Sequence, residues 1–405
     1  MMLTKIRDGK ELWGWMMVSL LFAASPPYVW RASLQKAVGA ESKKMTARIP
    51  WSRCLSQRPE FYATDEAIQI ADNVLLYQRD TGGWPKNIDM AKPLGEEDKA
   101  SVRKAKSRKD STLDNSATHT QIRYLAEVYY ATTLDRFRQG IIKGVDYLLE
   151  AQYPNGGWPQ FYPFEGHENY SRHITFNDGA MIGAMSILQD IAQRKRQYAF
   201  VDPDRCEKAR KAVEKGIECI LTCQIIVDGK RTGWCQQYDE KTLEPRPARS
   251  YEKVSICGSD SADIVRFLMG IDRPSQQIIK GIEGAIVWFN QAKLTGIRQI
   301  EKSDRSVEGG YDRVVIEDAN APPIWARFYQ IGTNRPIFCG RDGIIKYKLS
   351  EIEQERRMHY AWYGYWPAEL LAKDYPAWRE KWAPAPAVLL RKDKAAGGPK
   401  TKQLK

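Results

Sequence analysis

Residues 73–87 of the chain read NVLLYQRDTGGWPKN, and the pattern returns as DYLLEAQYPNGGWPQF at 146–161 and ECILTCQIIVDGKRTGWCQQY at 218–238. A glutamine recurs at intervals of 74 and 72 residues, at Gln78, Gln152 and Gln224. A tryptophan recurs at intervals of 74 and 76 residues, at Trp84, Trp158 and Trp234. Three copies at matched spacing indicate an internal repeat, and units that cannot bury an apolar face alone stack on their neighbours.

Each copy closes an apolar stretch with helical character, namely Ile68–Leu76, Val145–Leu149 and Ile217–Ile220. A turn containing glycine follows each stretch, which is what a left-handed helix C-cap requires, and Pro85 and Pro159 prevent the helix from restarting. Between the copies, apolar residues recur at three- and four-residue spacing, over His119–Tyr130 and Asp178–Gln193.

With two helices and a loop per repeat and a weak strand signal, the sequence predicts an all-α fold. We expect an (α/α) toroid or barrel of helix-pair repeats, closed or partly closed, with few short strands. The turns that carry GGW would then meet at one rim. The charged segment Ala91–Asp110, which is low in large apolar residues, is expected to be a mobile surface loop.

The two ends of the chain differ in composition from its middle. Residues 1–40 have the layout of an export signal and leader, because basic residues precede an apolar run, Leu12–Ala24, that is too short to span a bilayer. This predicts a secreted or periplasmic protein without stable membrane insertion. Residues 41–382 are expected to form a single domain, and residues 383–405, rich in Ala, Pro and Lys, a disordered tail.

The composition points to an anionic partner. The formal net charge is +12, which creates a field that gathers polyanions, whether nucleic acid, anionic lipid or acidic polysaccharide. The 13 Trp and 20 Tyr add flat rings that suit stacking on sugars or bases. The 7 cysteines are odd in number and scattered, so we expect mostly buried thiols and at most one bridge.

Common nucleophile and metal motifs are missing from the sequence. The 4 histidines show no HExxH-type spacing, and no GxSxG or phosphate-cradling glycine loop occurs. Carboxylates offer more, because Asp114, Asn115 and Asp178 each precede an amphipathic helix at comparable places in successive repeats. Asp and Asn are favoured helix caps, so a purely structural role stays open. If both acids reach one rim, their oxygens suit Ca²⁺.

A cationic group opposes these acids. Five arginines stand among Pro, Gly, Trp and Tyr, in loops expected to line an opening: Arg246, Arg249, Arg327, Arg335 and Arg341. A guanidinium binds a carboxylate through two parallel hydrogen bonds, which lysine cannot imitate. Each of these arginines could equally belong to a structural ion pair.

Six motifs together carry a more specific resemblance. They are GGWPKNIDM (82–90), STLDNSATHTQ (111–121), NGGWPQFYP (155–163), HITFNDGAM (173–181), GWCQQYDEKTLEPRPARSYE (233–252) and FYQIGTNRPIFCGRDG (328–343). In this order and spacing the chain resembles the pectate lyases of polysaccharide lyase family 10, from about Trp51 to Leu371. The resemblance implies an (α/α) toroid-type fold and calcium-assisted β-elimination of polygalacturonate with an arginine as base.

Carried over by motif, the resemblance assigns roles to single residues. Asp114 and Asp178 would help to bind Ca²⁺, and Arg249 in ARSYE would be the base. Arg327 and Arg341 would hold substrate carboxylates, with Asn115 beside the metal and the substrate. The expected partners are pectate oligosaccharides and not nucleic acid, and the expected state is a monomer.

The implied chemistry is physically consistent. The C5 proton of a uronate is hard to abstract until its carboxylate is neutralised, which a cation and arginines achieve electrostatically. An ordinary arginine stays protonated because its pKa exceeds about 12. We therefore expect calcium and nearby cations to lower the pKa of Arg249, and activity to favour alkaline pH.

Two other function classes stay open on the sequence. The QxxxGGW strings also resemble repeats of terpene cyclases, but the acidic DxDD-like or DDxxD clusters that start carbocation chemistry are missing. A non-catalytic protein that binds acidic polysaccharide could use the same scaffold, and it would not need Asp114, Asp178 and Arg249 together.

Overall fold

The computed structural model describes residues 49–164 and 169–383. The predicted export signal and leader (1–40) lie outside these residues, as does the predicted tail (383–405) apart from Ala383. The bounds of the predicted single domain therefore stay a prediction. Within the described residues, no helix is long and apolar enough to cross a membrane.

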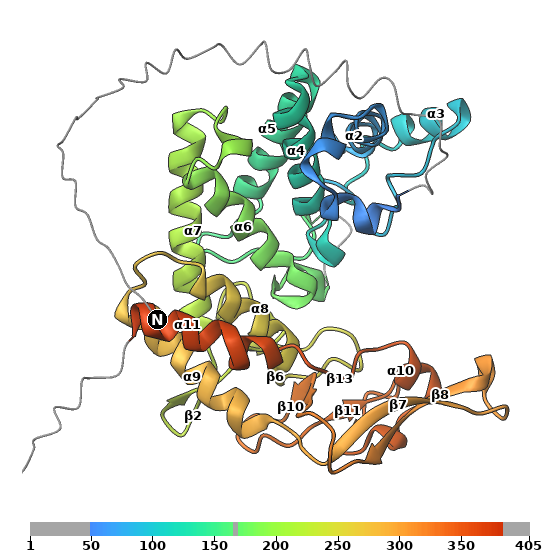
Figure 1. The fold of residues 1–405 in the computed structure, drawn as a ribbon, viewed down its shortest axis with the longest axis vertical. Coiled ribbons are helices and arrows are strands. Elements are labelled where there is room, and N and C mark those ends of the chain that lie inside the picture. The colour runs from blue at the N-terminus through green and yellow to red at the C-terminus, as the bar shows by residue number, and fades with distance from the viewer. Residues whose placement is uncertain (1–48, 165–168, 384–405) are drawn as a thin grey trace, which may run out of the picture. The chain divides into compact units, whose positions relative to one another are not determined.

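Helix α2, blue in Figure 1, is followed along the chain by three helix pairs, the last of which ends with α9. Their bounds are α2 Asp65–Tyr77, α4 His119–Thr132, α5 Asp135–Glu150, α6 Ala180–Ala192, α7 Pro203–Cys223, α8 Gly258–Met269 and α9 Gln276–Ala292. Helix α4 packs on α5, α6 on α7 and α8 on α9, while α4, α6 and α8 contact in succession. This confirms the predicted class, an all-α (α/α) fold of helix-pair repeats with few short strands, and the helical stretches expected from periodicity.

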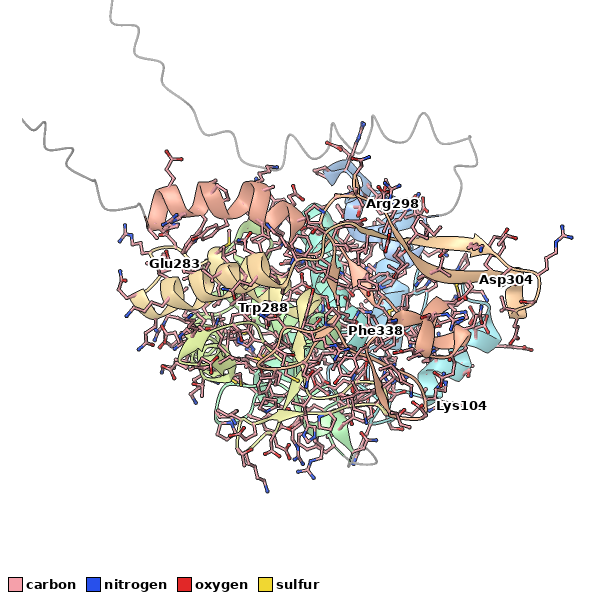
Figure 2. The ribbon with its side chains drawn as sticks, turned by 90° about the horizontal axis from the view of Figure 1, so that it is seen from below. Lys104, Glu283, Trp288, Arg298, Asp304 and Phe338 are labelled. Atoms are coloured by element: carbon pink, nitrogen blue, oxygen red, sulfur yellow. The ribbon has the colours of Figure 1, made fainter. Side chains whose placement is uncertain are left out.

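The strands are short apart from one hairpin. The pairs are β1 Ile174–Thr175 with β4 Gln237–Tyr238, β4 with β5 Pro245–Arg246, β6 Ile256–Cys257 with β10 Phe328–Tyr329, β9 Trp325–Ala326 with β13 Tyr363–Gly364, β11 Phe338–Cys339 with β12 Ile345–Lys346, and β2 Ile226–Val227 with β3 Lys230–Arg231. The exception pairs β7 Ile297–Ser303 with β8 Tyr311–Glu317. Figure 2 shows Asp304 near the tip of this hairpin, and Trp288 and Phe338 in the interior.

The repeated glutamine ties each turn to the following helix pair. The side-chain amide Nε2 of Gln78 donates to the carbonyl of Gly82 in its own turn at 2.8 Å and to that of Gly140 in α5 at 2.9 Å. The other two copies make the same pair of bonds, from Gln152 to Gly156 and Ala212 and from Gln224 to Thr232 and Gly281. The repeat read from the sequence is therefore a repeat of hydrogen bonds.

The repeated tryptophan is buried and donates back to the helix before it. The indole Nε1 of Trp84 donates to the carbonyl of Val74 at 2.7 Å. Trp158 and Trp234 donate in the same way to Leu148 and Ile220. Trp325 does so to Phe289 in α9 at 2.9 Å, which makes it a fourth copy. Sequence spacing hid this copy because the β7–β8 hairpin separates α9 from its tryptophan.

The turn glycines have a different role from the expected one. They do not cap helices, because the C-cap residues of α2 and α5 are Gln78 and Ala151, neither in the left-handed region. Gly82 and Gly156 lie further on, with φ of 95° and 91°. A side chain at either glycine would strike a backbone carbonyl of the next helix pair, so these glycines allow close packing of successive repeats.

The segment Ala91–Asp110 was expected to be a loop, and this is wrong. It contains helix α3, Glu96–Lys104, none of whose residues is buried. Acidic residues fill the first turn and basic residues the last, which favours a helix through its dipole, and the side chain of Asp98 accepts the N–H of Gly95 at 3.3 Å.

The remaining helices are α10 Gln354–Met358 and α11 Tyr375–Trp382. All seven cysteine thiols are buried, and none forms a disulfide within the described residues.

The glutamine bridge makes a stability prediction. Gln78→Ala leaves two carbonyls without their donor, one in its own turn and one in α5, and should lower the free energy of unfolding by about 2–3 kcal/mol. Gln57 also donates to a carbonyl, that of Arg53, but at an exposed site, so Gln57→Ala should cost no more than about 0.5 kcal/mol. Urea unfolding of both variants measures this, and equal losses would contradict the bridging role.

Candidate active site

A cleft of about 80 Å³ lies where the turns of successive repeats meet. It is lined by Lys86, Asp114, Asn115, Gln160, Tyr170, Asn177, Asp178, Gln236, Gln237, Ala248, Arg249 and Glu252. Nearly all of these side chains are polar or charged, which suits a hydrophilic ligand and not an apolar one. The structure thus brings four residues singled out in the sequence, Asp114, Asn115, Asp178 and Arg249, to one opening.

The position two residues after each repeat tryptophan supplies this region with a polar side chain. In the first three copies these residues are Lys86, Gln160 and Gln236, and all line the cleft. In the fourth copy the residue is Arg327, whose Nη2 donates to Oδ1 of Asn177 at 2.9 Å. The sequence contained this signal, since the position is fixed by the tryptophan, but the fourth copy was not recognised.

Two short 3-10 turns carry the acids, Asp114–Ser116 and Asn177–Gly179, and the two turns contact each other. Each is placed by a hydrogen bond to a repeat tryptophan: Thr112 donates its N–H to the carbonyl of Trp84, and Thr175 to that of Trp158.

Counting from these threonines, Asp114 corresponds to Asn177, and Asn115 to Asp178. The acids were expected at comparable places, but they are offset by one residue. Asn115 and Asp178 share the left-handed conformation, with φ of 49° and 51°. The two turns therefore have the same backbone conformation at their second residue, but the order of acid and amide is reversed, Asp-Asn in the first turn and Asn-Asp in the second.

Neither acid caps its helix, so the capping alternative is wrong. The N-cap residues are Thr118 for α4 and Gly179 for α6, and no side chain makes a cap hydrogen bond there. Non-glycine residues in the left-handed region carry strain of order 1 kcal/mol or more, and such strain concentrates at functional sites. Asn115 and Asp178 therefore occupy strained positions beside the cleft, and neither acid is used as a helix cap.

Asp114 is buried and only half satisfied. Its Oδ2 forms an ion pair with Lys86 Nζ. Its Oδ1 has no hydrogen-bond partner among the described residues, and the residue is 3% exposed. A buried carboxylate oxygen without a donor is costly unless a cation or a ligand completes it.

Asp178 is more exposed and sits between charges of both signs. Its Oδ2 accepts from Nδ2 of Asn177 at 2.9 Å, and its Oδ1 lies 3.8 Å from Nη2 of Arg327. Burial raises the pKa of Asp178 above its ordinary value, while Arg327 lowers it and the nearby Asp260 and Asp114 raise it further. Acidic side chains this close together repel one another, so a cation between them is stabilised.

Arg249 reaches the cleft from a chain segment with no helix. Its Nε and Nη2 donate to the two oxygens of Glu252, the first at 2.8 Å. Burial alone would lower the pKa of Arg249, but the hydrogen bonds and charge of Glu252 outweigh it, so the pKa is raised. This is opposite to the direction expected from the sequence, which overlooked Glu252 as a partner.

The other arginines are distributed differently from the predicted cluster. Arg327 has a side chain 12% exposed behind Asp178. Arg341 is outside the residues that line the cleft and pairs with Glu355 at 3.0 Å. Arg246 lies 3.6 Å from Asp239, and Arg335 stacks 3.4 Å over the ring of Tyr347. Of the five predicted arginines, only Arg249 and Arg327 lie near Asp114 and Asp178.

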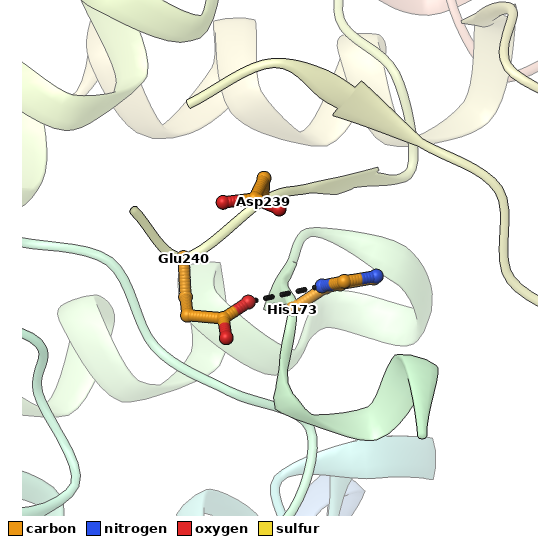
Figure 3. A group of neighbouring side chains, drawn as sticks. All are labelled: His173, Asp239 and Glu240. Atoms are coloured by element: carbon orange, nitrogen blue, oxygen red, sulfur yellow. Dashed lines mark hydrogen bonds and ion pairs between the residues drawn. The ribbon is translucent and has the colours of Figure 1, made fainter. Parts of the chain in front are cut away.

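A second group of metal-ligand type is formed by His173, Asp239 and Glu240 (Figure 3). Nδ1 of His173 lies 3.1 Å from the Glu240 carboxylate, and the Asp239 carboxylate accepts two backbone N–H groups of its own turn. Two guanidinium groups approach these acids, Arg172 at 3.8 Å from Glu240 and Arg246 at 3.6 Å from Asp239. These partners already supply the positive charge that a metal would bring, so we regard this group as structural.

Comparisons with known proteins bear on the family to which the chain belongs. The family model described as pectic acid lyase matches residues 78–371. A family 10 polysaccharide lyase from Cellvibrio cellulosa is 29% identical with a TM-score of 0.65, covering 80% of this chain and 95% of its own. A mutant of the Cellvibrio lyase in complex with trigalacturonic acid is 28% identical with a TM-score of 0.67, covering 83% of this chain and 100% of its own.

No curated protein sequence matches the chain. The family match nevertheless spans more than half of the residues and includes every residue of the cleft. It also favours a lyase over a terpene-cyclase-like enzyme. The chain therefore belongs to the pectic acid lyase family, and it is a polysaccharide lyase.

Proposed function

We propose that this protein cleaves polygalacturonate by calcium-assisted β-elimination, with Arg249 as the base. The observation that carries the proposal is the convergence of Asp114, Asp178 and Arg249 on one polar cleft. Support for the substrate comes from the family 10 relative that binds trigalacturonic acid. The net charge of +12 would gather an anionic polymer toward this cleft.

The oxygens at the cleft fit a calcium ion. Asp114 offers a buried Oδ1 without a partner, and Asp178 offers a second carboxylate in the adjoining turn. Calcium takes hard oxygen ligands from carboxylates, amides and water. Asn115 would lie beside the ion and the substrate, because it lines the same cleft. Its Nδ2 donates to Oδ1 of Asn87 at 2.8 Å. When bound, the ion would neutralise a uronate carboxylate and so acidify the adjacent C5–H.

The role of Arg249 follows from its place. A neutral guanidine nitrogen takes the C5 proton, the C–H electron pair forms the C4–C5 double bond, and the glycosidic oxygen leaves C4. That oxygen takes a proton from solvent water. Because only the neutral fraction of Arg249 can act, and its pKa is raised, the rate should climb as pH becomes more alkaline.

The remaining cations would complement the anionic substrate. Lys86 lines the cleft beside Asp114, and Arg327 adds its charge behind Asp178. We keep Arg327 and Asn115 as residues that contact substrate. The same role for Arg341 stays a prediction drawn from the motif, because this residue pairs with Glu355 outside the cleft.

Replacing Arg249 tests the assignment of the base. Arg249→Ala should reduce formation of the unsaturated product by about 10³-fold, because loss of a general base costs about 10²–10⁴. Binding of trigalacturonate, measured by calorimetry, should change little. Arg246→Ala is the matched control, since Arg246 is exposed in the same segment, and it should keep its activity. Turnover retained by Arg249→Ala would remove Arg249 from this role.

Calcium dependence tests the metal assignment. Chelation should abolish activity and added Ca²⁺ should restore it. Asp114→Asn should weaken Ca²⁺ binding at least about tenfold, because it removes one ligand charge. Glu240→Gln changes an acid of the His173 group and should leave Ca²⁺ affinity unchanged. Calorimetry with Ca²⁺ distinguishes the two groups, and the reverse pattern would place the ion at His173.

A further inference from the structure

Glu252 is a buried acid whose hydrogen bonds converge on one arginine. It is 3% exposed, and its carboxylate accepts from the backbone N–H of Arg249 at 3.1 Å, from Arg249 Nε at 2.8 Å and from Arg249 Nη2. The hydroxyl of Tyr360 donates to the same carboxylate at 2.8 Å. Four donors thus fix the carboxylate, and three of them belong to Arg249.

This pairing leaves one end of the guanidinium unoccupied. Within the described residues, Nη1 of Arg249 donates no hydrogen bond, although the other two nitrogens do. The side chain of Arg249 is 42% exposed, while that of Glu252 is 3% exposed. The arginine therefore binds the buried acid along its Nε–Nη2 edge, and Nη1 is the guanidinium nitrogen left without a hydrogen-bond partner among the described residues, on a side chain that lines the cleft.

We propose that Glu252 is a positioning residue that selects Nη1 of Arg249 as the nitrogen that accepts the substrate proton. This inference rests on the proposed function. Nε has a single hydrogen, which it donates to Glu252, and Nη2 lies against the same carboxylate, whose charge stabilises the hydrogens of Nη2. The proton that solvent removes at alkaline pH therefore comes from Nη1, the nitrogen that does not contact Glu252. The lone pair left on Nη1 takes the C5 proton, which regenerates the guanidinium while the glycosidic C–O bond breaks.

The same contact opposes deprotonation, and this makes it measurable. The carboxylate stabilises the charged form of Arg249, while the hydroxyl of Tyr360 draws charge away from the carboxylate. The charged and titratable groups around Arg249 are Glu252, Tyr251, Tyr360, Tyr170, Asp178 and Arg356. Among those groups, Glu252 is the acid that forms hydrogen bonds with the guanidinium.

Rates measured against pH test the proposal through shifts of opposite sign. Glu252→Gln should move the alkaline midpoint of kcat down by about one pH unit or more. It should also lower the plateau about ten- to hundredfold, since the guanidine is no longer oriented. Tyr360→Phe keeps the ring but strengthens the pairing of Glu252 with Arg249, so the midpoint should move up. Asp72→Asn, which breaks a similar Nε–Nη2 pair with Arg136 outside the cleft, should move neither.

A second readout does not depend on activity. In protein labelled with ¹⁵N-arginine, pairing with Glu252 should slow rotation of the guanidinium, giving separate Nη1 and Nη2 signals for Arg249 that merge in Glu252→Gln. Merged signals in the wild-type protein, or an unshifted midpoint in folded Glu252→Gln, would overturn the proposal. If Glu252→Gln fails to fold, the upward shift in Tyr360→Phe decides. Absence of unsaturated product from the wild type would instead overturn the proposed function.

Discussion

The glutamine after each repeat helix donates its side-chain amide to two carbonyls, one in its own turn and one in the next helix pair. That pair of bonds fixes how far one repeat stands from the following one. The repeat tryptophan that follows donates its indole N–H to a carbonyl of the preceding helix, and this hydrogen bond fixes the direction of the tryptophan's own backbone carbonyl. In each of the first three repeats this carbonyl receives an N–H from the start of the next turn, that of Thr112, Thr175 or Cys257.

The polar residues near the cleft lie at fixed distances in sequence from the residue that donates to the tryptophan carbonyl. Two and three residues after the donor come Asp114 and Asn115 in the first case, and Asn177 and Asp178 in the second. The third case gives Ser259 and Asp260, where Asp260 is buried with Oδ2 lacking a partner among the described residues. Burial raises the pKa of Asp260, while Arg327 lowers it. The same hydrogen bond to a repeat tryptophan thus precedes each of these sets of polar side chains.

The sequence was sufficient for whatever depends on local periodicity. Helices α2 and α4 to α7 were predicted, because apolar spacing and turn residues act within one repeat. The one-residue offset between Asp114 and Asp178 was not predicted. The position of each acid in its turn depends on a backbone hydrogen bond such as that from Thr112 to Trp84, which lies far back in the chain. Trp325 was missed because a hairpin interrupts the spacing.

Helix α3 was missed because its composition resembles a loop, and only its charge order reveals it. Glu252 stands three residues after Arg249, and the sequence could have suggested a pair. What it could not show was that the acid is buried and therefore dominates the chemistry of the arginine.

The central claim is that the stacked turns bring Asp114 and Asp178 together around one cation that faces the substrate. A crystal structure of the full chain with Ca²⁺ and trigalacturonate, with the ion located by anomalous scattering, tests this most directly. The account predicts an ion bound by Asp114 Oδ1 and Asp178 and by a uronate carboxylate, with Nη1 of Arg249 toward C5. An ion at His173, Asp239 and Glu240, or a sugar bound away from both acids, would contradict it.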